Sequence, residues 1–153
     1  MLENKVWPAM RATTPANVTA HRIETGKTAP GIADVLFFIK SPLALQHRVG
    51  WVENKTALKA DGRLMLREGV GAAQADFLST ACGAGCRGSV VIWWDEGDWI
   101  YWLLVEGQHA PRLVGLRYLP LDVLRQWSGA AGKAGSAREA ARSVWAALTG
   151  TGG

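Results

Sequence analysis

Short apolar segments, separated by turns that contain glycine, proline or polar residues, recur along most of this chain. Five segments rich in β-branched and aromatic residues are predicted to be strands: residues 18–25, 32–39, 49–56, 89–94 and 99–105. Periodicity predicts helices over residues 2–12, 71–81 and 121–127. Because residue 8 is proline, we expect the first helix to bend or restart there. The order α-β-β-β-α-β, with further elements, predicts an α/β fold with a central mixed sheet flanked by helices.

The end of the chain has a pattern of its own. Residues 129–135 are glycine and alanine with a single lysine, which predicts a flexible linker. Ser136 and Glu139 have the spacing of a capping box for a final helix over residues 136–149. Four apolar residues of that helix form one stripe: Ala141, Val144, Trp145 and Leu148. The stripe must be buried against its own domain or against a second subunit. We therefore expect a domain over residues 1–128, a linker, and an appended C-terminal amphipathic helix.

Basic residues are concentrated near the N-terminus. Residues 1–60 contain eight Lys or Arg and four acids, whereas residues 61–153 contain nine of each. The net charge of +4 is therefore an excess of the first 60 residues, where a basic surface would attract a polyanion such as nucleic acid. A net charge of this size also aids solubility, so charge alone does not decide the function. The candidate nucleic-acid contacts in this region are Arg22, Lys27, His47 and Arg48.

Three of the four acids in the basic region fall on predicted strands, and two of them, Asp34 and Glu53, fall on neighbouring ones. In the third strand, a period of two places Glu53 and Lys55 on one face, roughly 7 Å apart and within reach of one phosphate. Asn54 points to the opposite, packed face, where it needs a hydrogen-bond partner. If the second strand pairs antiparallel with the third, Asp34 lies close to Glu53. Two converging carboxylates can hold Mg²⁺, while Lys55 orients a water molecule or stabilises charge on the phosphate.

A Glu-x-Lys pair on a strand is usually a surface pair, but a second motif accompanies it here. The runs PGIAD (30–34) and WVENK (51–55) together resemble the signature of the PD-(D/E)xK nuclease superfamily. Gln74 opens the next predicted helix, as in the VRR-NUC and Holliday-junction-resolvase branches. The run HRIE (21–24) before the signature resembles small phage-type members. The order of elements over residues 1–105 agrees with this superfamily.

This resemblance implies a restriction-endonuclease-like core and assigns roles to individual residues. Asp34 and Glu53 would be metal ligands, Lys55 would assist catalysis, and Gln74 would place the lysine or the phosphate. An additional acid would be Glu3 or Glu24, and the sequence leaves that choice open. The expected cofactor is Mg²⁺, with Mn²⁺ as a substitute.

The leading hypothesis is a Mg²⁺-dependent endonuclease acting on DNA, with branched or Holliday-junction-like DNA implied by the resemblance. A homodimer is expected, because selection of a branched structure usually needs two active sites at a fixed separation. The final helix and a tryptophan-rich hairpin are the candidate interfaces. The alternative is a catalytically degenerate nucleic-acid-binding module of the same fold. A third hypothesis, a protein-interaction domain with surface acids, leaves the basic excess unexplained.

The remaining features affect location and packing. No signal peptide is visible and the apolar runs are too short to span a membrane, so we expect a cytoplasmic protein, in the host cytoplasm if it is phage-encoded. Cys82 and Cys86 are expected to be reduced thiols, not zinc ligands. The predicted hairpin carries Trp93, Trp94, Trp99 and Trp102. About half of these should pack in the core, since alternate residues point opposite ways.

Overall fold

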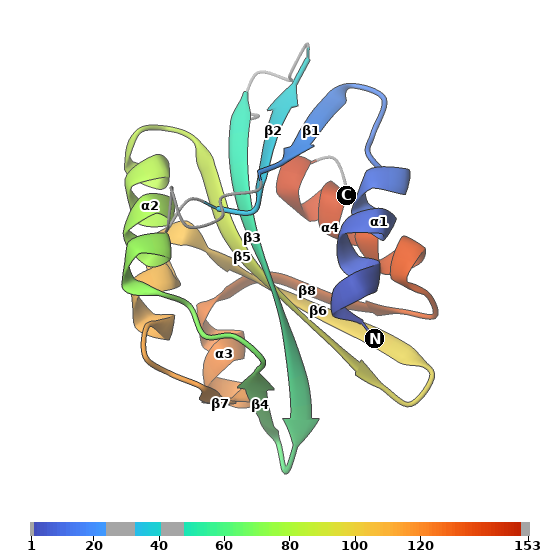
Figure 1. Ribbon diagram of the computed structural model, residues 1–153, viewed down its shortest axis with the longest axis vertical. Helices are drawn as coiled ribbons and strands as arrows, with labels where there is room; N and C mark the ends of the chain where they lie inside the picture. Colours follow the sequence, from blue (N-terminus) through green and yellow to red (C-terminus); the bar gives the residue numbers. More distant parts are fainter. Residues whose placement is uncertain (1, 24–32, 41–47, 151–153) are drawn as a thin grey trace.

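The computed structural model describes residues 2–23, 33–40 and 48–150. A mixed sheet runs through them in the order β1-β2-β3-β5-β6-β8, with β4 paired to β3 and β7 paired to β4 (Figure 1). Only β3 and β5 pair in parallel among the named strands of this part of the chain. The strands are β1 (Val18–Arg22), β2 (Val35–Ile39), β3 (Val49–Ala60), β4 (Arg63–Leu66), β5 (Arg87–Glu96), β6 (Trp99–Glu106), β7 (Tyr118–Pro120) and β8 (Ser128–Ala134).

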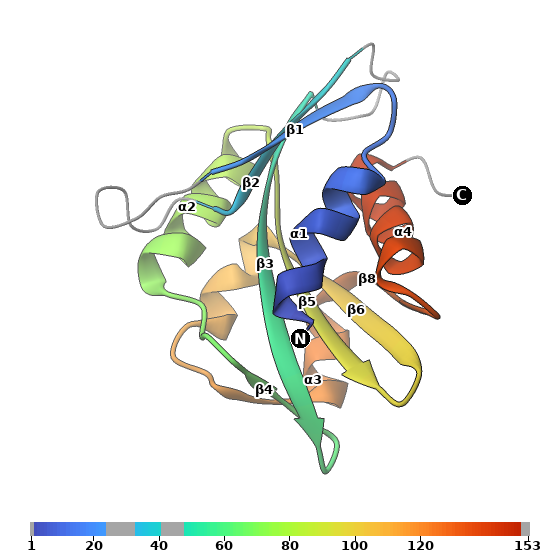
Figure 2. The same ribbon diagram turned by 45° about the vertical axis from the view of Figure 1, so that its right-hand side comes forward.

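Helices cover both faces of this sheet. They are α1 (Glu3–Ala12), α2 (Ala72–Gly83), the 3-10 helix η1 (Gly107–Leu113), α3 (Leu121–Trp127) and α4 (Ala137–Thr149). Helices α1 and α4 lie side by side on one face, and α2 and α3 lie on the other (Figures 1 and 2). The predicted fold class is therefore confirmed, and the predicted order α-β-β-β-α-β holds except that β4 stands between β3 and α2. No helix in the described segments is long and apolar enough to cross a membrane.

Each face of the sheet has its own hydrophobic core, and this explains the tryptophan-rich hairpin. Trp93 is buried against α1 and α4, whereas its neighbour Trp94 is buried in the core beneath α2 and α3. Trp102 pairs with Trp93 across the hairpin and is buried with it. Trp99 is 46% exposed at the end of the hairpin. Three of the four residues are thus buried, more than the predicted half, because both faces of the sheet are covered.

The predicted linker is wrong: residues 128–134 form β8, which pairs antiparallel with β6 at one edge of the sheet. The small residues of β8 are explained by Trp102, which faces it from β6. A Cβ atom at Gly132 would lie 2.8 Å from the Trp102 indole nitrogen, so only glycine fits there without a shift. Taken alone, the composition of β8 resembles that of a flexible linker. The residue that requires its small side chains, Trp102, is about 30 residues earlier in the sequence.

The last helix belongs to the same domain. The N–H of Glu139 donates to the Ser136 side chain over 3.2 Å, which confirms the Ser136 half of the predicted capping box; the Glu139 carboxylate accepts the N–H of Gly135 instead of that of Ser136. All four residues of the predicted apolar stripe are buried, and the Trp145 indole N–H donates to the carbonyl of Met10 in α1 over 2.9 Å. The sequence left open whether the stripe packs against its own domain or against a second subunit, and the structure shows that it packs against its own domain. An independent helical appendage is therefore wrong as a description of α4.

Two further differences concern local structure. Helix α1 runs through Pro8 without interruption, so the helix does not restart there. Strand β3 extends to Ala60 and turns into β4 through Asp61 and Gly62, which have φ of 52° and 73°. An Asp-Gly pair with positive φ at both positions is the usual signal for a two-residue β-hairpin. The sequence carries this signal at residues 61–62, although the strand β4 was not predicted. The hairpin forms one side of the candidate site.

Candidate active site

The candidate site lies at an interruption in one edge of β3. Strand β2 pairs with residues 49–52 of β3, and β4 pairs with residues 57–60. The carbonyl of Arg48 accepts the N–H of Ile39 in β2, and the carbonyl of Thr56 accepts the N–H of Arg67, which follows β4. Residues an even number apart present their carbonyls to the same edge of a strand, so β2 and β4 lie along the same edge of β3. Residues 53–55 are therefore left between the two partner strands, while β5 pairs along the other edge.

Asp34 and Glu53 meet at this interruption. Asp34 directly precedes β2, and the pairing of Val35 with Val52 brings it next to Glu53, as the predicted antiparallel pairing requires. The Asp34 carboxylate accepts a hydrogen bond from the backbone N–H of Asn54, and the Glu53 carboxylate accepts one from the backbone N–H of Asp34. The two carboxylates thus accept backbone N–H groups that a continuous neighbouring strand would otherwise bond. These two hydrogen bonds hold the acids together.

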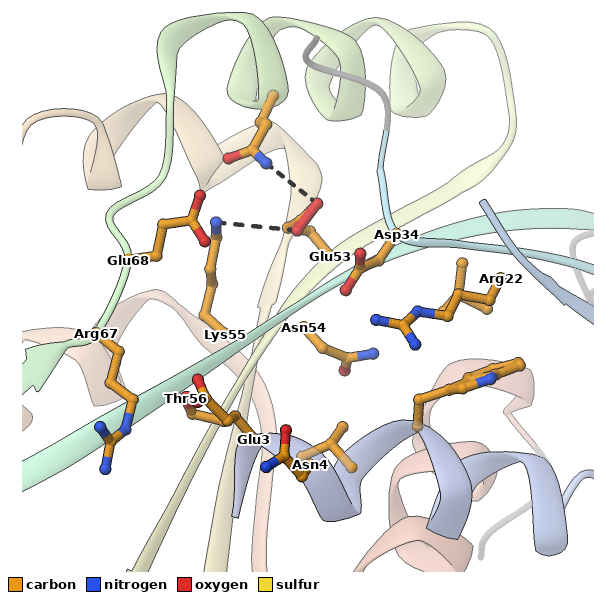
Figure 3. A pocket seen from close by; sticks show the side chains of 14 residues that line it. Glu3, Asn4, Arg22, Asp34, Glu53, Asn54, Lys55, Thr56, Arg67 and Glu68 are labelled. Carbon is orange, nitrogen blue, oxygen red and sulfur yellow. Dashed lines mark hydrogen bonds and ion pairs between the residues drawn. The ribbon is translucent and has the colours of Figure 1, made fainter. Parts of the chain in front are cut away.

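Lys55 and Gln74 complete the group around Glu53 (Figure 3). The Lys55 Nζ lies 3.9 Å from a Glu53 oxygen, and the side chains of both residues are almost fully buried. The Gln74 amide donates to the other Glu53 oxygen over 3.3 Å, while its own carbonyl accepts the N–H of Gly71 at the start of α2. Helix α2 therefore fixes the amide that orients the carboxylate. The predicted group of Asp34, Glu53, Lys55 and Gln74 is brought together in the structure.

The electrostatics of the group disfavour two free carboxylates. Burial, followed by the charge of Asp34, raises the pKa of Glu53 from 4.5 to about 8, against the opposing effect of Lys55. Burial also raises the pKa of Asp34, and the positive charges of Arg22 and Lys55 only partly offset this. A buried pair of acids that is costly to ionise is stabilised by a nearby cation, and such perturbed groups are typical of functional sites.

Two further acids line the same pocket, which has a volume of about 400 Å³. Glu3 reaches it from α1, so one of the two candidates for the additional acid is placed at the site; Glu24 lies outside the described residues. Glu68, which was not predicted, follows β4, and its charge helps raise the pKa of both Asp34 and Glu53. Only recognition of the Asp-Gly hairpin could have placed Glu68 here. Within the described ranges, no cluster of three or more His, Cys, Asp or Glu forms a ready-made metal cage.

The predicted nucleic-acid contacts have different outcomes. Arg22 lines the pocket, whereas Arg48 is exposed at the start of β3 and is not among the residues that line it. Lys27 and His47 lie outside the described residues. Arg67, which the sequence analysis missed, also lines the pocket. The described basic groups at the site are therefore Arg22 and Arg67 in addition to Lys55.

Asn54 has the partner that its packed position requires. Its side-chain oxygen accepts the indole N–H of Trp93 over 3.0 Å, and its amide lies 3.4 Å from the Met10 sulfur. These contacts join β3 to β5 and to α1 beneath the site. The polar residue between Glu53 and Lys55 is thus compatible with an ordered site, and it secures the strand that carries both of them.

The comparisons with known proteins give a similarity in structure and none in sequence. No family model matches the sequence, and no curated protein matches it. Among solved structures, the chain is similar to Hjc, a Holliday junction resolvase from the archaeal hyperthermophile Archaeoglobus fulgidus. The TM-score is 0.40 and the identity 18%, over 70% of this chain and 71% of that one. A likeness at this level concerns the fold alone.

The raised pKa of Glu53 predicts a specific pH dependence of stability in the absence of metal. Between pH 4.5 and about 8 the folded protein binds this proton more tightly than the unfolded chain, so the free energy of unfolding falls as the pH rises. Relative to Glu53→Gln, the wild type should lose roughly 3 kcal/mol between pH 5.5 and pH 8. Urea unfolding in EDTA at both pH values measures this difference. Equal losses in the two proteins would contradict the assigned pKa.

Proposed function

We propose that this protein is a metal-dependent endonuclease that hydrolyses phosphodiester bonds in DNA. The observation that carries the proposal is the convergence of Asp34, Glu53 and Lys55 at the open edge of β3, inside a pocket that also presents Arg22 and Arg67. Carboxylates serve as ligands for a divalent cation, and the three basic side chains favour the phosphates of a nucleic acid.

The chemistry of the donor set fits Mg²⁺. Asp34 and Glu53 supply hard carboxylate oxygens, and Mg²⁺ is commonly bound through one or two carboxylates together with water and substrate phosphate oxygens. Burial, and then neighbouring negative charge, raises the pKa of both acids despite the positive charge of Lys55, joined at Asp34 by that of Arg22, so a bound cation would favour their ionised forms. Asp34 and Glu53 would therefore hold the ion, with Glu3 or Glu68 able to bind one of its waters. When bound, the cation polarises the scissile phosphate and lowers the pKa of a water molecule.

The chain's own side chains have complementary roles. The Lys55 ammonium is buried and anchored by Glu53, so it can donate to a phosphate oxygen as negative charge develops there during attack by water. Gln74 keeps Glu53 oriented and acts as a positioning residue. Arg22 and Arg67 lie at the pocket and would hold phosphates of the bound strand.

Branched DNA and a homodimer belong to the same proposal. The PGIAD and WVENK motifs resemble those of junction-resolving nucleases, and this supports branched DNA as the first substrate to test. The apolar stripe of α4 is buried within its own domain and is not available as the dimer interface. Of the two surfaces first considered, the end of the β5–β6 hairpin with Trp99 therefore remains as the candidate.

Substitution of Glu53 tests the proposal. Glu53→Gln removes a metal-ligand charge while it retains the size of the side chain, so cleavage of labelled DNA with Mg²⁺ should be lost and DNA affinity in EDTA should remain. Glu96→Gln is the matched control, because Glu96 is an exposed glutamate that pairs with Lys59 outside the pocket. Cleavage by Glu53→Gln at the rate of the control would refute the assignment. Both activities are measured by gel assay and fluorescence anisotropy.

A further inference from the structure

An exposed sheet face lies beside the candidate site. Met65 in β4 pairs with Leu58 of β3 on one side and with Tyr118 of β7 on the other. Paired residues of neighbouring strands project from the same face of a sheet, so these three side chains form a row across it. Leu58 is 42% exposed and Tyr118 is 61% exposed, and no helix covers them. They line a shallow depression together with Arg63.

Two arginines flank the middle of this row along the direction of β4. Alternation along β4 puts Arg63 and Arg67 on the same face as Met65, two residues away on either side. The four-residue separation corresponds to about 13 Å along the strand. We define the hairpin face as Leu58, Met65, Tyr118, Arg63 and Arg67. It is an apolar and aromatic platform between two guanidinium groups.

The hairpin face lies on the sheet face opposite to Glu53 and Lys55, and it meets the pocket of the two acids at the open edge of β3. Arg67 belongs to both, and its N–H donates to the carbonyl of Thr56, which also lines the pocket. Figure 3 shows the Arg67 side chain directed away from Lys55 and Glu68, toward the side on which Thr56 and Glu3 lie. From strand geometry, the backbone of Tyr118 is roughly 8 Å from that of Arg67. A strand that passes from the pocket over the open edge of β3 can therefore reach the platform by way of Arg67.

The chemistry of the hairpin face matches a nucleotide. A tyrosine ring beside aliphatic and thioether side chains offers a surface on which an unpaired base can stack, and base stacking on aromatic side chains tolerates any sequence. The flanking arginines match the phosphates on either side of that base. Negative charge lies beyond each arginine: Asp61 at the tip of the hairpin, beyond Arg63, and Glu68 next to Arg67 in the pocket.

We propose that the hairpin face is a stacking site for an unpaired nucleotide of the substrate strand, across the open edge of β3 from the phosphate that is cut. This inference rests on the proposed nuclease function and adds a substrate feature to it: DNA with unpaired nucleotides near the cut is bound in preference to a continuous duplex. Tyr118 contributes the ring, and Arg63 and Arg67 contact the flanking phosphates.

The experiment compares a duplex bearing a single-stranded flap with the same duplex fully paired. Binding is measured by fluorescence anisotropy in EDTA, and 2-aminopurine in the flap reports stacking through quenching of its emission. Tyr118→Ala should weaken flap binding by about fivefold or more, abolish the quenching and leave duplex affinity unchanged. Tyr118→Phe should behave as the wild type. Phe38→Ala, which removes an exposed aromatic side chain of β2 outside both the pocket and the hairpin face, is the matched control.

The outcomes separate this inference from the nuclease proposal. If the wild type cuts DNA with Mg²⁺ but Tyr118→Ala binds and quenches the flap as the wild type does, only the stacking site is refuted. An equal loss in Phe38→Ala also refutes it, because the effect would not be specific to the hairpin face. If the wild type binds no nucleic acid, both proposals fail, and a protein partner becomes the occupant of this face.

Discussion

Replacement of Lys55 by alanine should reduce the rate of DNA cleavage by about 10³-fold and change DNA affinity little. Lys55 is buried in the pocket, with its ammonium 3.9 Å from Glu53, and its stem is held on the same face of β3 as that acid. A single lysine adds little to the many contacts that bind a DNA strand. Its charge has its largest effect when the attacked phosphate becomes more negative, so the loss should appear in kcat and not in KM.

The same measurement needs a control for folding, because removing a buried cation leaves Glu53 and Asp34 without its charge. Lys55→Met keeps most of the apolar stem and should lose activity to the same extent. Lys59→Ala, on the same strand but paired with exposed Glu96, should cut as the wild type does. Single-turnover assays with saturating enzyme isolate the chemical step. Wild-type rates in Lys55→Met would exclude Lys55 from catalysis.

The second large effect concerns stability. Trp145→Ala should lower the free energy of unfolding by about 4 kcal/mol. Trp145 is buried between α4, α1 and the sheet; its ring meets Phe37 edge-on with centroids 5.6 Å apart, and its N–H bonds to Met10. The substitution removes this packing and leaves the Met10 carbonyl without its indole donor. Urea unfolding followed by circular dichroism measures the loss.

Trp99→Ala is the control for this stability measurement, since Trp99 is 46% exposed and its removal should cost much less. If α4 were an appendage on a flexible linker, Trp145→Ala would leave the main unfolding transition unchanged. A large shift in that transition, by contrast, requires α4 and β8 to unfold together with the rest of the sheet. The two substitutions therefore distinguish an integral helix from an attached one.

The part of the site that could be predicted from the sequence depends on local geometry. Alternation along β3 placed Glu53 and Lys55 on one face, and the antiparallel hairpin placed Asp34 beside them; the register confirms both. Those inferences needed only periodicity and the pairing of neighbouring strands. Gln74 was singled out by the resemblance to the VRR-NUC and Holliday-junction-resolvase branches, and it lies in the first turn of α2.

The residues that were missed depend on contacts between distant segments. Arg67 and Glu68 join the site only because β4 folds back on β3, and the tail was misjudged because Gly132 is matched to Trp102 of another strand. Composition describes a segment without its partner, so a glycine-rich edge strand and a flexible linker look alike. The sequence predicts that the apolar stripe of α4 is buried, but it does not predict that the stripe packs against α1.

The central claim is that Asp34, Glu53 and Lys55 form a metal-dependent DNA-cleaving site. The most direct test is gel cleavage of labelled four-way junction, flap, duplex and single-stranded DNA with Mg²⁺ or Mn²⁺, beside EDTA and Glu53→Gln controls. We expect the wild type to cut branched DNA with metal, and neither control to cut. Binding of DNA without cleavage under every metal would contradict the claim and would identify a nucleic-acid-binding module of the same fold.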